Sequence, residues 1–114
     1  MKTIVILVLA TTIALGLSNL FAWMRGARKP LMIGAHLLFA IGGLESFVAG
    51  GGAAGGVGGQ WGPIAAGLLA AALFCGLLGA IIRKNARGVA DVLLATHAIL
   101  GVLGFVAVLG WAFP

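Results

Sequence analysis

Two histidines, His36 and His97, are the side chains of this sequence whose type and spacing point to chemistry. Each lies six residues after the expected start of a helix, at Pro30 in one case and at Asp91 in the other. At about 1.5 Å per residue, this spacing places each imidazole roughly 9 Å along its helix. Ionisable groups in membrane segments are costly and are usually retained for function. The pair therefore predicts a shared ligand, and the commonest candidate is the iron of a b-type haem.

The elements that must position these histidines are four apolar runs. The chain has 114 residues, of which 62% are hydrophobic and 8% are charged. A run of about 20 apolar residues spans a hydrocarbon core of roughly 30 Å. The runs cover residues 3–24, 31–50, 63–82 and 89–112. We expect one all-α transmembrane domain over residues 1–114, an up-down four-helix bundle in which facing helices hold a cofactor.

The basic residues predict which side of the membrane each loop occupies. Two short loops contain six of the seven Lys and Arg residues: Arg25, Arg28, Lys29, Arg83, Lys84 and Arg87. Basic residues concentrate in cytoplasmic loops, so we expect both loops in the cytoplasm. The membrane expected for the chain is the inner membrane of a bacterial cell. Both termini and a flexible glycine-rich connector over residues 50–62 would then lie outside. This topology explains the net charge of +5 without nucleic-acid binding.

Small residues beside each histidine fit a flat cofactor. Positions four and seven residues beyond a helical residue share its face, and a porphyrin edge would fit where those positions are small. They are Ala40 and Gly43 after His36, and Gly101 and Gly104 after His97. Small residues also line helix interfaces in general, because close approach drives packing in lipid.

Haem carries two propionates, which need positive partners or water. Arg28, Lys29 and Arg87 lie one or two turns from the histidines on the side of the basic loops. The positive ends of both helix dipoles point the same way. We therefore expect the propionates to face the cytoplasmic loops.

A faint internal repeat relates the two halves of the chain. Aligning Pro30 with Asp91 also aligns His36 with His97. The same alignment pairs Gly43 with Gly104. Each half would be a helix, a basic loop and a second helix that carries one histidine.

With these residues established, the chain resembles a small transmembrane cytochrome b of the bis-histidine type. The segment THAILGVLGF, residues 96–105, is similar to the histidine-bearing helices of ascorbate-reducible cytochromes and of respiratory membrane-anchor subunits. The resemblance implies a haem between parallel helices two apart in sequence. It also implies an electron-transfer subunit that exchanges electrons with quinone or with other membrane subunits. Two histidines allow one such haem.

Other functions remain open on the sequence. Glu45 is a carboxylate in the second apolar run, and a small multidrug-type transporter would use such a group. Those transporters place their glutamate in the first helix, which counts against this interpretation. A cofactor-free structural or assembly subunit would use its histidines for packing. No serine or cysteine is spaced to pair with a histidine as nucleophile and base, so hydrolytic chemistry is not expected.

Overall fold

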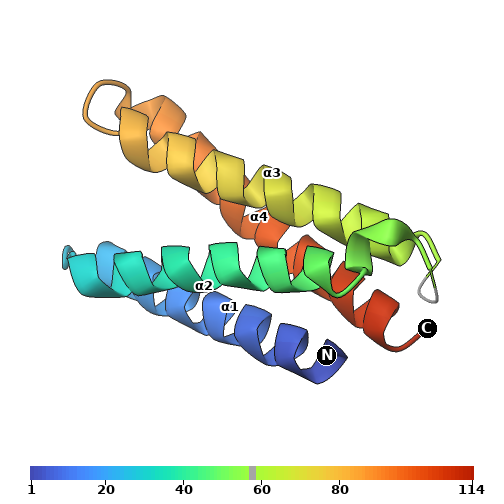
Figure 1. The fold of residues 1–114 in the computed structure, drawn as a ribbon. Helices are drawn as coiled ribbons and strands as arrows, with labels where there is room; N and C mark the ends of the chain where they lie inside the picture. Colours follow the sequence, from blue (N-terminus) through green and yellow to red (C-terminus); the bar gives the residue numbers. More distant parts are fainter. Residues whose placement is uncertain (57–58) are drawn as a thin grey trace. The chain divides into compact units, whose positions relative to one another are not determined.

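The computed structural model describes residues 1–56 and 59–114 and is helical in each part (Figure 1). The four long helices are α1 (Lys2–Met24), α2 (Pro30–Ala49), α3 (Trp61–Ile82) and α4 (Arg87–Ala112). All four are long and apolar enough to cross a membrane. The expected helices are therefore confirmed, with ends that differ from the predicted ones by no more than two residues. The sidedness of the loops stays a prediction.

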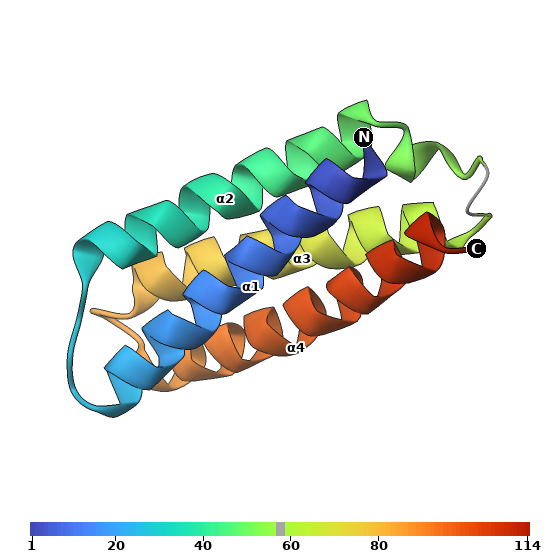
Figure 2. The same ribbon diagram turned by 90° about the horizontal axis from the view of Figure 1, so that it is seen from below.

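The chain divides into two compact units, Met1–Gly50 and Gly51–Pro114. The first unit is a hairpin of α1 and α2, and the second is a hairpin of α3 and α4 together with the short 3-10 helix η1 (Gly52–Ala54). In both views the two helices of a hairpin run antiparallel from a short connecting loop (Figures 1 and 2).

Helix starts follow from proline and from the loops. Pro30 is the first residue of α2, where its missing N–H removes no helical hydrogen bond. Pro63 is the third residue of α3, still within the first turn, whose N–H groups lack helical partners. Helix α4 begins at Arg87, so the expected place of Asp91 in the first turn is wrong. The carboxylate lies one turn further in and is exposed.

The loop of the first hairpin is fixed by a glycine. After α1, Gly26 adopts the left-handed conformation with φ of 74°. Its N–H donates to the carbonyl of Trp23 at 3.0 Å, and the N–H of Ala27 donates to the carbonyl of Ala22 at 2.8 Å. These two bonds form a Schellman motif, which satisfies the last carbonyls of the helix. The motif ends α1 inside the basic loop.

The glycine-rich connector is partly structured. Residues 57–58 of the predicted flexible segment lie outside the described residues. Before them, Gly52 is buried, and its carbonyl oxygen occupies the space that a side chain on Gly62 would need. Trp111 is also buried and contacts Gly62, whereas Trp61 is exposed. The indole of Trp111 therefore packs inside the second hairpin, near the end of α4.

Candidate functional site

His36 joins the two helices of the first hairpin. The ring lies on α2 and is half-buried, and its Nδ1 is 2.8 Å from the carbonyl oxygen of Thr12 on α1. A carbonyl oxygen accepts hydrogen bonds and cannot donate them, so the proton of this bond belongs to Nδ1. A backbone carbonyl in the middle of α1 thus accepts a second hydrogen bond, beyond the one within its own helix.

His97 makes the same bond in the second hairpin. Its Nδ1 on α4 lies 2.7 Å from the carbonyl oxygen of Ala72 on α3, and the ring is again half-buried. Nδ1 is therefore the donor here as well. Two histidines in separate hairpins share one tautomer and one kind of partner.

The protonated Nδ1 determines what the rest of each ring can do. In a neutral imidazole one nitrogen carries the proton and the other carries a lone pair. With the proton on Nδ1, the lone pair of His36 and of His97 is on Nε2. Histidines that bind metals almost always donate their second ring N–H to a carbonyl, carboxylate or water, which fixes the tautomer and orients the ring. Both rings make a hydrogen bond of this kind.

The two histidines are equivalent in the backbone carbonyl that each contacts, but not in their distance from the start of their own helix. His36 lies six residues after the start of α2, but His97 lies ten residues after Arg87, the start of α4. The equal distances of roughly 9 Å expected from the sequence are therefore wrong for His97, which is about 15 Å along its helix. The feature that the two histidines share is the carbonyl on the facing helix to which each is hydrogen-bonded.

The internal repeat extends to the packing of each hairpin. Thr12 and Ala72 are 60 residues apart, and the two histidines are 61 residues apart. Buried positions follow the same spacing: Val5 and Ala65 are fully buried in the first helices, and Phe47 and Val108 are fully buried in the second helices. The two halves of the chain thus share these packing positions, offset by 60 residues in the first helices and by 61 residues in the second.

Two of the small residues predicted to face a cofactor are helix contacts within their own hairpins. A Cβ on Gly43 would lie 2.7 Å from the side chain of Leu9, and a Cβ on Gly104 would lie 2.8 Å from that of Leu69. These two contacts match each other, because the leucines are 60 residues apart and the glycines are 61 residues apart. Gly101 differs, because a Cβ there would meet nothing within 4 Å. Ala40 is half-buried. A porphyrin contact at these positions stays a prediction.

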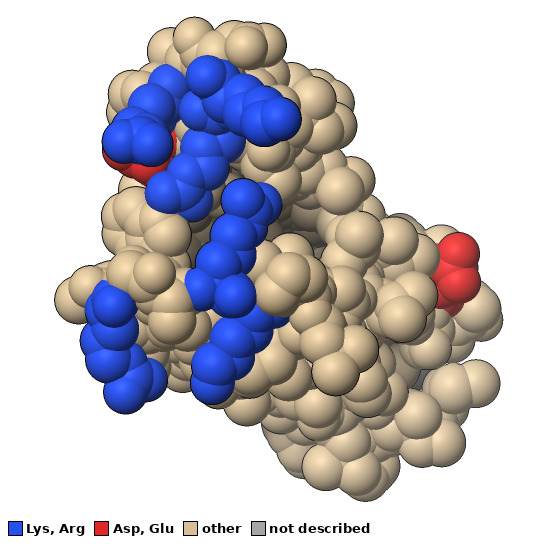
Figure 3. Space-filling model, turned by 90° about the vertical axis from the view of Figure 1, so that its left-hand side faces the viewer, with Lys and Arg blue, Asp and Glu red and all other residues tan. Residues whose placement is uncertain are grey.

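The charged residues of interest are exposed at the ends of the helices. Arg28, Lys29 and Arg87 are exposed, and all basic side chains except that of Lys2 lie at the loop end of their hairpin (Figure 3). Glu45 is also exposed, near the opposite end of α2. Among the described residues, no group of three or more His, Cys, Asp or Glu side chains comes together.

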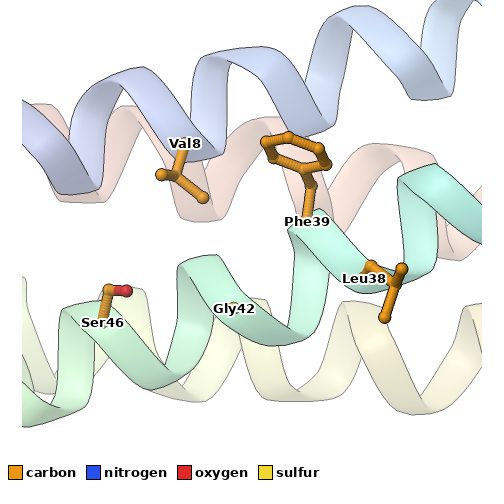
Figure 4. Close-up of a pocket in the computed structure, with 5 residues that line it drawn as sticks. All are labelled: Val8, Leu38, Phe39, Gly42 and Ser46. Carbon is orange, nitrogen blue, oxygen red and sulfur yellow. The ribbon is translucent and has the colours of Figure 1, made fainter.

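A cavity of about 270 Å³ lies in the first hairpin (Figure 4). Its lining residues are Val8, Leu38, Phe39, Gly42 and Ser46. At the 61-residue spacing, the second hairpin has Leu103 where the first has Gly42. The two hairpins therefore differ in sequence at a position that lines the cavity.

The sequence pattern predicts the two histidines but not their hydrogen-bond partners. Thr12 and Ala72 act through backbone carbonyls, and no side-chain pattern marks a backbone acceptor. The detectable signal was the spacing of 60 residues between Gly16 and Gly76, each four residues after one of these carbonyls.

Fold and site together define an all-helical chain of two similar hairpins, each long and apolar enough to cross a membrane and each containing one histidine bonded across its helices. Comparisons of the chain with protein-family models, curated proteins and solved structures find no match.

Proposed function

We propose that this chain is an electron-transfer subunit of a membrane complex, with His36 and His97 as the two axial ligands of one b-type haem. The observation that carries the proposal is the matched pair of bonds from Nδ1 to a backbone carbonyl. Each bond leaves Nε2 as the lone-pair nitrogen, the atom that would bind iron. When bound, haem would supply one-electron transfer at a potential set by its ligands and surroundings.

The membrane arrangement supports two equivalent ligands. A chain with four spans has its second and fourth helices running in the same direction across the bilayer. The basic loops favour the cytoplasmic side for the loop end of each hairpin, in a bacterial inner membrane. Arg28, Lys29 and Arg87 are exposed at that end and would pair with the propionates.

The partners would be other membrane subunits or quinone. The described residues consist almost entirely of membrane-type helices and short connections, so donors and acceptors of electrons must come from elsewhere. Exposed apolar side chains on every helix suit contact with lipid or with helices of a partner.

A cofactor-free structural subunit is the second candidate, and one observation favours it. Both imidazoles already make a helix-to-helix hydrogen bond, which is a sufficient reason to keep a polar side chain in an apolar hairpin. In that case the two histidines would act independently, one for each hairpin.

Haem titration of the detergent-purified protein separates the two candidates. We expect saturation at one haem per chain and loss of this binding in both His36→Ala and His97→Ala. Glu45→Gln is the matched control, since it changes an exposed ionisable residue of α2 and should bind haem like the parent protein. Haem uptake that survives either histidine substitution, or no uptake by the folded parent protein, would overturn the proposal.

A further inference from the structure

We propose that Gly16 of α1 and Gly76 of α3 are positioning residues for the two histidines. Because neither residue has a side chain, the imidazole of the opposite helix reaches the carbonyl oxygen one turn earlier. The glycines thereby fix the Nδ1–H tautomer and direct Nε2 of each ring. The consequence for iron binding rests on the function proposed above, whereas the consequence for the tautomer does not.

A helix covers most of its own carbonyl oxygens with side chains. A helical side chain lies over the turn that precedes its own Cα. The residue at position i+4 therefore covers the carbonyl oxygen of residue i. Three threonines of this chain show it directly, because their hydroxyls donate to that oxygen: Thr11 to Leu7 at 2.8 Å, Thr12 to Val8 at 2.9 Å and Thr96 to Val92 at 2.8 Å.

Gly16 and Gly76 occupy this covering position for the two acceptor carbonyls. Gly16 is four residues after Thr12, and Gly76 is four residues after Ala72. The imidazole lies where the missing side chain would be. A Cβ on Gly16 would lie 2.9 Å from Cε1 of His36, and a Cβ on Gly76 would lie 2.7 Å from Nδ1 of His97. Any side chain at either position would displace the ring from its carbonyl.

Other helical glycines show that this contact is specific to the two sites. A Cβ on Gly34, Gly67 or Gly101 would meet nothing within 4 Å. At Gly43 and Gly104 the space for a side chain is filled by leucine side chains, which pack against the helix and offer no polar group. Only at Gly16 and Gly76, among the described glycines, is an imidazole the neighbour.

The tautomer of each histidine in the full-length protein, prepared without haem in detergent micelles, tests the inference. Two-bond correlations between ring protons and ¹⁵N nuclei distinguish Nδ1–H from Nε2–H. We expect Nδ1–H for both rings in the parent protein. In Gly16→Ala, His36 should shift toward Nε2–H while His97 stays unchanged, and Gly76→Ala should do the reverse. Gly34→Ala and Gly67→Ala are the matched controls and should change neither ring.

The unaffected histidine and the helical circular dichroism report whether each variant folds. If one alanine variant unfolds its hairpin, the other variant and the parent protein still decide the question. Retention of Nδ1–H by His36 in folded Gly16→Ala, or by His97 in folded Gly76→Ala, would overturn the inference. So would Nε2–H on either ring of the parent protein.

Haem binding extends the test to the ligand role. We expect Gly16→Ala and Gly76→Ala each to weaken haem binding by about tenfold or more relative to Gly67→Ala, and to alter the g-values of the oxidised haem. If the parent protein takes up no haem but the tautomers respond as expected, the glycine inference stands and the proposed function fails. If haem binds and the alanine substitutions change neither its affinity nor its g-values, the glycines do not position the histidines for iron binding.

Discussion

The Nδ1 of His97 lies 2.7 Å from the carbonyl oxygen of Ala72, on the facing helix of its hairpin. The first hairpin contains the same relationship between His36 and Thr12, at 2.8 Å. A hydrogen bond between membrane helices contributes about 0.6 kcal/mol on average, so these bonds alone stabilise the hairpins modestly. Their larger consequence is chemical, because each determines which ring nitrogen has the lone pair.

Alanine at Gly43 or Gly104 should destabilise the corresponding hairpin. The new Cβ would overlap Leu9 or Leu69, and overpacking of this kind typically costs about 1–3 kcal/mol. The better helix propensity of alanine, about 1 kcal/mol, offsets part of that cost. Unfolding in mixed detergent and dodecyl sulfate, followed by circular dichroism, measures the difference. Gly67→Ala is the control, and stability equal to that of the control would contradict the packing described here.

Alanine at Gly101 separates a cofactor contact from helix packing. The described residues leave open space there, so no packing is lost, and the free energy of unfolding should rise by up to about 1 kcal/mol through the better helix propensity of alanine. If a porphyrin edge lies against this face, the added methyl group should weaken haem binding roughly tenfold, equivalent to about 1.4 kcal/mol. Haem titration and the unfolding assay together give the answer. Unchanged haem affinity would remove Gly101 from the cofactor site.

Gly26 should tolerate no other residue without a loss of stability. Its φ of 74° lies in the left-handed region, where an L side chain costs about 1–2 kcal/mol. Gly26→Ala should therefore weaken the first hairpin by that amount, while Gly88→Ala, at an open helical position, should not. The same unfolding experiment compares them. A neutral Gly26→Ala would argue against the Schellman motif at the end of α1.

Glu45 should be dispensable for haem. The carboxylate is exposed and lies nine residues beyond His36, which places it on a different face of α2. Glu45→Gln should leave haem content and midpoint potential unchanged, as measured by redox titration. A loss of substrate flux in proteoliposomes with Glu45→Gln, together with no effect of His36→Ala, would favour the transporter alternative.

The sequence was sufficient to predict the helices but not the contacts between them. Four apolar runs predicted α1–α4 because length and hydropathy depend on each segment alone. The role of Gly43 was harder to predict, since a small residue can face either a cofactor or a leucine of the next helix. The carbonyl of Thr12 could not be predicted as a partner, because every residue has one and its access depends on Gly16 and on the register of α2. The equal distances of the two histidines from their helix starts were wrong, because α4 begins at Arg87, before the predicted start.

The visible spectrum of the detergent-purified protein, oxidised and then reduced with dithionite, tests the central claim most directly. We predict the sharp reduced α-band of a six-coordinate low-spin b haem, absent from both His36→Ala and His97→Ala and present in Glu45→Gln. A folded protein that is colourless and stays so after addition of haem would contradict the account, as would a band that survives the loss of either histidine.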